Sequence, residues 1–99
     1  MAVVEVSIVP IGVESTSLSS YVAGALKVLE KSTLQYELTA MGTIISGDLD
    51  DIIKTVRLMH ESFFSAGLQR VVTQIRIDDR RDRKASPEQK IRSVREKLK

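Results

Sequence analysis

The order in which strand-like and helix-like segments follow one another restricts the possible folds of this chain more than any other feature. Four segments read as strands, because apolar residues alternate with other residues at 3–9, 35–39, 43–46 and 70–78. Between the second and third segments, Ala40-Met41-Gly42 is a short turn that predicts a β-hairpin.

Two helices are predicted in the gaps after the first and third strands, at 17–31 and from Asp48 to Ala66. The first places apolar residues at helical spacing at Val22, Ala25, Leu26 and Leu29. The resulting order, β-α-β-β-α-β, is that of the ferredoxin-like α+β fold. Right-handed crossovers then predict an antiparallel sheet in the order 4-1-3-2, with both helices on one face.

The same periodicities predict which side chains share a face. We expect the core side of the first two strands to hold Val4, Val6, Ile8, Tyr36 and Leu38, and one face of the last strand to hold Val71, Thr73, Ile75 and Ile77. The buried stripe of the second helix is expected to hold Leu49, Ile52, Ile53, Val56, Phe63 and either Met59 or His60. The opposite sheet face is mixed, and burying Glu5 or Glu37 there would require a partner such as Arg76 or a cationic ligand. Such a face favours subunit association, either on the face or along a sheet edge.

We expect one domain over residues 1–99, with a core at 1–79, a charged connector at 80–85 and a C-terminal helix at 86–99. Residues 1–79 contain 6 Lys/Arg and 10 Asp/Glu, a net charge of −4, whereas residues 80–99 contain 9 and 3, a net charge of +6. A basic tail on an acidic body fits either a nucleic-acid arm or a contact with a neighbouring subunit. The last helix has a narrow apolar stripe (Ile91, Val94 and Leu98) and no place on a two-helix layer, which favours contact with another protomer.

Composition excludes several classes of protein. Cysteine is absent, so disulfides, thiol catalysis and thiolate metal sites are excluded. No apolar run approaches the roughly 20 residues that span a bilayer, and no signal peptide is visible. We therefore expect a cytoplasmic protein without a membrane partner.

Motifs for catalysis are missing as well. His60 borders the buried stripe of a helix, and Asp48, Asp50 and Asp51 suit a helix start better than a metal site. Phosphate loops, nucleophile elbows and zinc signatures are also missing, so we expect neither an enzyme nor a bound cofactor or metal. RNA-binding domains of this topology stack bases on aromatic residues of the sheet, and no aromatic residue is predicted on the uncovered face, so nucleic acid is a disfavoured partner.

A ligand site is predicted where a hydroxyl-rich segment (Ser17, Ser19, Ser20 and Tyr21) begins the first helix. A helix N-terminus offers free N–H groups to an anion or polar ligand, although simple capping explains the same serines. The topology places this segment and the turn Met41-Gly42-Thr43 at one end of the sheet. We therefore expect them to line one small-molecule pocket, with Gly42 allowing close approach of the backbone.

Three segments carry a resemblance to a known family: Val6–Val22 (VSIVPIGVESTSLSSYV), Met41-Gly42-Thr43 and Ile77–Asp82 (IDDRRD). In order and spacing, the chain resembles the small thiamine-binding proteins of ferredoxin-like fold. The resemblance implies a homotetramer built as a dimer of dimers, with the C-terminal helix contributing to assembly. It also implies binding of thiamine or a related pyrimidine without catalysis.

Thiamine would require an apolar or aromatic wall, polar partners for its aminopyrimidine and negative potential for its thiazolium. Tyr21 or Tyr36, the serines with Thr43, and Glu5 or Glu37 are the candidates for these roles. A phosphorylated ligand would place its phosphate at the N-terminus of the first helix. The alternative is a regulatory or interaction module that senses another small metabolite or an anion at subunit interfaces.

Overall fold

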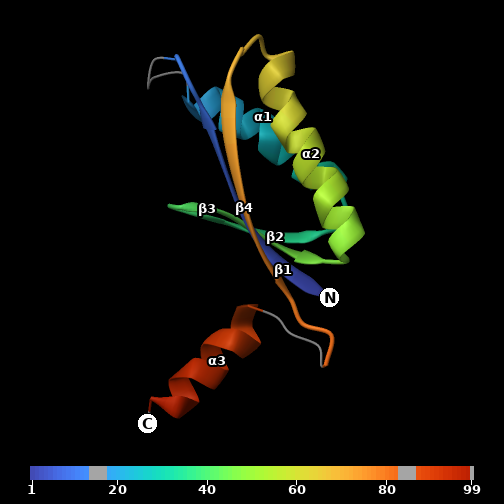
Figure 1. The fold of residues 1–99 in the computed structure, drawn as a ribbon, viewed down its shortest axis with the longest axis vertical. Helices are drawn as coiled ribbons and strands as arrows, with labels where there is room; N and C mark the ends of the chain where they lie inside the picture. The colour runs from blue at the N-terminus through green and yellow to red at the C-terminus, as the bar shows by residue number, and fades with distance from the viewer. Residues whose placement is uncertain (14–17, 83–86, 99) are drawn as a thin grey trace.

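The computed structural model describes residues 1–13, 18–82 and 87–98 (Figure 1). Its elements are β1 (Ala2–Pro10), α1 (Leu18–Lys31), β2 (Gln35–Thr39), β3 (Gly42–Gly47), α2 (Leu49–Ser65), β4 (Val71–Asp79) and α3 (Pro87–Lys97). The predicted order of strands and helices is confirmed, and the bounds agree with the predicted ones to within two residues.

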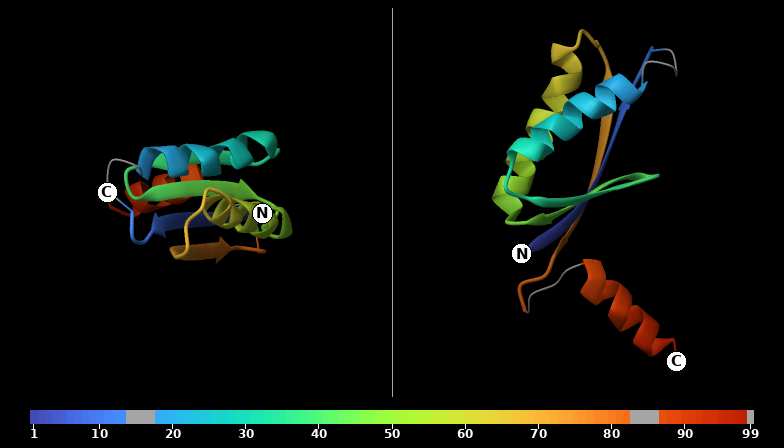
Figure 2. Two further views of the ribbon diagram at one scale, coloured as in Figure 1. Left: turned by 90° about the horizontal axis from the view of Figure 1, so that it is seen from above. Right: turned by 180° about the vertical axis from the view of Figure 1, so that it is seen from behind.

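The four strands form one antiparallel sheet in the order β2-β3-β1-β4, as predicted. Helices α1 and α2 lie together on one side of this sheet (Figure 2). The core between the layers is closed by large side chains that are fully buried, namely Phe63, Leu29, Ile45, Ile52 and Val4. The fold is therefore the two-layer, ferredoxin-like α+β fold.

Local chemistry explains where α2 begins and how it packs. The Asp48 carboxylate accepts a hydrogen bond from the Asp51 N–H at 3.3 Å, which caps the helix. The sequence predicted that either Met59 or His60 is buried in the stripe of α2, and the buried residue is Met59. His60 is half-buried instead, and its Nδ1 lies 2.7 Å from the Thr73 hydroxyl on β4. This hydrogen bond ties the helix layer to the edge strand.

The two strands that flank β1 differ in how far they follow it. β4 pairs with β1 along its whole length, from Ala2 to Pro10. β3 pairs only with Ala2–Val6, because it begins at Gly42 and its last partner is the pair Val6–Thr43. The second half of β1 therefore has a neighbouring strand on one side only.

Several side chains predicted to face the core lie on the expected face but stay exposed. Tyr36 and Leu38 are 40% and 56% exposed on β2, and Ile75 and Ile77 are 42% and 49% exposed on β4. β2 and β4 are the two edge strands of the sheet, and the helices packed on its face do not cover these positions. Ile53, predicted in the buried stripe of α2, is likewise 41% exposed. The buried part of the core is thus narrower than the periodicity predicted.

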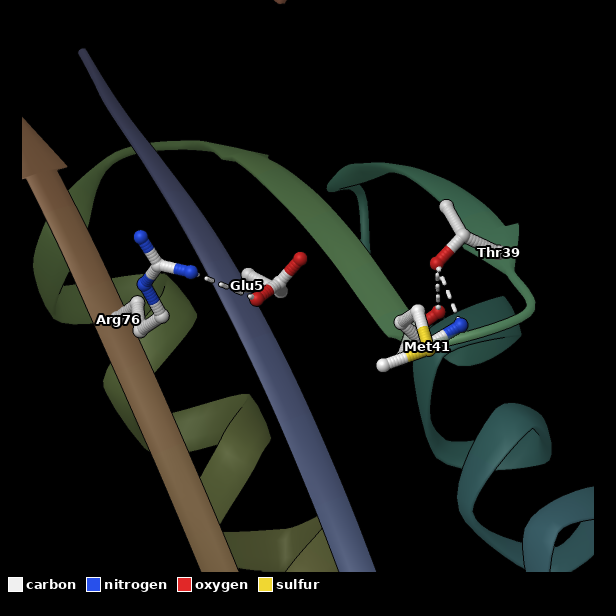
Figure 3. Close-up of polar contacts among 5 residues, drawn as sticks. Glu5, Thr39, Met41 and Arg76 are labelled. Carbon is white, nitrogen blue, oxygen red and sulfur yellow. Dashed lines mark hydrogen bonds and ion pairs between the residues drawn. The ribbon is translucent and has the colours of Figure 1, made fainter.

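The other sheet face carries the ion pair that the sequence suggested. Arg76 Nη1 lies 3.7 Å from Glu5 Oε1, and these two residues are direct cross-strand neighbours (Figure 3). The Arg76 side chain is 85% exposed, so the pair contributes little to stability. It shows that Glu5 needs no cationic ligand to be accommodated on this face.

Helix α3 lies near the N-terminal end of β1, apart from α1 and α2 (Figure 1). Its apolar stripe is exposed, at 53% for Ile91, 58% for Val94 and 79% for Leu98. Of the predicted connector, residues 83–85 lie outside the described residues. Arg80 and Arg81 form ion pairs with Asp82 and Asp79. Among the described helices, none is both long enough and apolar enough to cross a membrane.

Two glycines provide a paired test of this packing. A Cβ at Gly42 would lie 2.7 Å from the Val6 carbonyl oxygen, whereas a Cβ at Gly24 in α1 would have no atom within 4 Å. We expect Gly42→Ala to lower the free energy of unfolding by about 1–3 kcal/mol and Gly24→Ala to raise it by about 0.5–1 kcal/mol. Urea unfolding followed by circular dichroism measures both. An unchanged stability of the Gly42 variant would contradict the close approach of the turn to β1.

Candidate functional site

A cavity of about 240 Å³ opens beside the second half of β1, the part with which β3 does not pair. Val6 and Ile8 of β1 lie along one side, and Met59 and Phe63 of α2 close another. The cavity exists because β3 pairs with β1 only as far as Val6, while β1 continues to Pro10. It lies in the layer between sheet and helices.

The wall on the α1 side is formed by Val22, Ala25 and Leu26. These residues share one face of the helix, because they are separated by three and four positions. Ala25 is buried and small, and it leaves room that a larger side chain would fill. The middle of α1, not its first turn, therefore borders the cavity.

The β2–β3 turn forms the remaining wall, with Leu38 to Thr43 lining the cavity. The Thr39 hydroxyl donates to the Gly42 carbonyl at 2.9 Å and accepts from the Met41 N–H at 3.2 Å (Figure 3). These bonds fix the turn against β1, and Gly42 permits the approach because a side chain there would meet the Val6 carbonyl. Met41 is 82% exposed and stands at the mouth of the cavity.

Tyr21 is connected to the cavity through an aromatic stack. Its ring lies 6.0 Å from that of Phe63, with an interplanar angle of 21°. Phe63 in turn lines the cavity, as does Thr43. Tyr21 is not among the lining residues, so the segment that begins α1 is connected to the cavity only through Phe63.

The cavity is predominantly apolar. None of the described residues that line it carries a charge. Glu5 and Glu37 both lie on the opposite face of the sheet, where Glu5 faces Arg76 and Glu37 is paired with Ile44 of β3. A ligand in the cavity would thus be held without these carboxylates. Within the described part of the chain, no three His, Asp or Glu side chains gather in a way that could hold a metal ion.

The predicted site residues are distributed unevenly around this cavity. Met41, Gly42 and Thr43 line it. Ser19 and Ser20 are exposed in the first turn of α1 and Tyr36 is exposed on β2, and none of the three is among the lining residues. Ser17 lies outside the described residues.

Sequence reasoning missed the contributions of the middle of α1 and of Met59 and Phe63. It assumed that the turn lies at the end of β1, whereas the turn lies opposite Val6. The strand lengths held the missing signal. A third strand of four residues cannot follow a first strand of seven to its end, so a gap beside the first strand was to be expected.

Comparison with known proteins identifies the family. The profile of the thiamine-binding protein family matches residues 4–95. The UPF0045 protein YqgV of Bacillus subtilis is 47% identical over 99% of this chain and 98% of its own length. A UPF0045 protein of Methanothermobacter thermautotrophicus is 43% identical over 99% and 100%, respectively. The chain belongs to the thiamine-binding protein family.

Solved structures agree with this membership. Protein MJ1052 of Methanocaldococcus jannaschii has a TM-score of 0.86 and 39% identity, and the match covers 96% of each chain. Protein TM0486 of Thermotoga maritima, whose description links it to thiamine biosynthesis or salvage, has a TM-score of 0.81 over 94% of this chain and 97% of its own. At 22% identity, TM0486 supports the fold alone. These two solved structures thus have the same fold as this chain.

Proposed function

We propose that this protein binds thiamine or a related pyrimidine or heterocycle without catalysing a reaction, and that it does so in the cavity between α1, α2 and the β2–β3 turn. The observation that carries the proposal is the cavity itself, which is open on one side, lined mostly by apolar side chains and bordered by a hydrogen-bonded turn. Ligand pockets have this character: mostly apolar walls with a few fixed polar groups. Membership of the thiamine-binding family supports the same ligand class.

The chemistry of the cavity supports binding in preference to catalysis. General acid–base catalysis needs a titratable group within hydrogen-bonding reach of the reacting atoms. The described lining offers hydroxyl and backbone groups only, and His60 bonds to Thr73 of β4 and is not among the lining residues. The alternative module that senses an anion receives less support, because an anion would need cationic or N–H partners that this lining does not include.

We further propose that the protein works as a homotetramer built as a dimer of dimers, in the cytoplasm. The exposed stripe of α3 supports association, since an isolated helix of 11 residues is marginal in water unless its apolar face is covered. The exposed Ile75 and Ile77 on the edge strand β4 offer a second apolar surface. None of these residues is among those that line the cavity, so association through them removes no described wall of the cavity.

Ligand binding is tested by isothermal titration calorimetry with thiamine. We expect the native protein to bind and Val22→Phe to lose at least tenfold in affinity, because the added ring occupies the cavity. Ala23→Phe is the matched control: Ala23 is exposed on the same helix and is not among the cavity-lining residues, so its variant keeps the native affinity. Absence of heat with native protein, or equal affinities of the two variants, would contradict the proposal.

Association is tested by light scattering after gel filtration. The native chain of 11.0 kDa is expected to elute with the mass of a tetramer. The double variant Ile91→Ser/Val94→Ser should give a smaller species, since it removes most of the apolar stripe. Arg92→Ser/Arg95→Ser alters exposed residues of the same helix and should remain tetrameric. A monomeric native protein, or identical masses for both double variants, would refute the role of α3.

A further inference from the structure

Thr43 is a buried polar residue in a mostly apolar wall, in which Ser7 and Thr39 are the other described residues with hydroxyl groups. Its residue is only 7% exposed, and it lines the cavity. The strand register sets it opposite Val6 on one side and Leu38 on the other, and both of these neighbours also line the cavity. Thr43 therefore belongs to the sheet face that looks toward the helices and the cavity.

The hydroxyl of Thr43 has no hydrogen-bond partner among the described residues, in contrast to that of Thr39, which makes two bonds in the adjacent turn. Among the described residues no fully buried side-chain oxygen or nitrogen is left without a partner, so the Thr43 hydroxyl is reached by solvent from the cavity. A ligand that covers this hydroxyl must pair with it, because a hydroxyl cut off from water without a partner costs free energy. Because the neighbouring lining side chains Val6, Leu38 and Met59 are apolar, a ligand is well placed to supply the partner. The Thr43 hydroxyl is thus a group with which a bound ligand can form a hydrogen bond.

Charge and size restrict what can enter. The described lining includes no charged side chain, so a permanent cation or a phosphate would lose its hydration there without compensation. The cavity of about 240 Å³ is also smaller than the roughly 300–1,000 Å³ of pockets that enclose drug-sized ligands. It has room for one ring system, and the rest of a longer ligand must remain outside its mouth at Met41.

We infer that Thr43 is the specificity-determining residue of this site, and that its hydroxyl selects an uncharged heteroaromatic ring while the charged part of the ligand stays at the mouth. This inference rests on the proposed function. For thiamine the selected half is the aminopyrimidine, because the thiazolium ring carries a permanent charge. Phosphorylation of the ligand then changes affinity little, since the phosphate does not enter the cavity.

Calorimetry with four probes tests the inference: thiamine, thiamine diphosphate, free 4-amino-5-hydroxymethyl-2-methylpyrimidine and the permanently charged 5-(2-hydroxyethyl)-3,4-dimethylthiazolium cation. We expect the pyrimidine to bind within about tenfold of thiamine, the thiazolium cation to give no heat at the same concentration, and the diphosphate to bind no more than about threefold tighter than thiamine. Thiamine binding with the pyrimidine silent, or a diphosphate preferred more than tenfold, would overturn this inference and leave the proposed function standing. Failure of thiamine and pyrimidine alike would overturn both.

Two variants isolate the hydroxyl. Thr43→Val keeps the shape of the side chain and removes the oxygen, so we expect about a tenfold loss of affinity for thiamine and for the pyrimidine, the scale of one hydrogen bond. Its melting temperature should be unchanged or higher, because no partner within the described protein is lost. Thr43→Ser keeps the oxygen and should bind within about threefold of native protein. Native affinity in the Val variant, or equal losses in both variants, would refute the selection by Thr43.

Discussion

The site depends on a difference in length between two neighbouring strands. β1 runs from Ala2 to Pro10, but its antiparallel partner β3 begins at Gly42, and its first pair with β1 is Thr43 with Val6. The chain therefore makes its β2–β3 turn beside the middle of β1. A turn can sit this close to a strand only without a side chain, since a Cβ at Gly42 would meet the Val6 carbonyl oxygen. From Ser7 to Pro10, β1 has no neighbouring strand on the β3 side. Side chains from α1 and α2 fill this space incompletely, and the cavity is what remains.

The character of the cavity follows from its position inside the layer between sheet and helices. Side chains between a sheet and its helices are mostly apolar because they are buried there. The walls of the cavity are therefore formed mainly by apolar residues of α1, α2 and β1. Among the described lining residues, polar side chains come from the hairpin turn, at Thr39 and Thr43, and from Ser7 of β1. Charged residues such as Glu5 and Arg76 occupy the other sheet face, where water or a second subunit can meet them. Separation of this kind leaves the described lining of the cavity without a charged side chain.

The sequence predicted the fold well because its signals are local and agree with one another. Alternation marked β1, three- and four-residue spacing marked α1 and α2, and the crossover rule then left a single sheet order. Burial was predicted less well, because periodicity reports the face of a residue and not what covers it. Tyr36, Leu38 and Ile77 lie on the expected face of edge strands and stay exposed. For the site, the turn Met41–Thr43, which lines the cavity, was predicted from the strand topology. Met59 and Phe63 were not, because their position at the cavity depends on where β3 stops.

The most direct test of the ligand site is a methyl nuclear magnetic resonance titration of the native protein with thiamine. β1 provides an internal comparison, because Val6 and Ile8 line the cavity while Val3 and Val9 lie on the opposite face of the same strand. The cavity in the α1–α2 layer predicts that methyl signals of Val6, Ile8, Ala25 and Met59 shift on binding, while those of Val3, Val9 and Val72 stay in place. Shifts of Val3, Val9 and Val72 without shifts of Val6 and Ala25 would place the ligand on the other face and contradict the account.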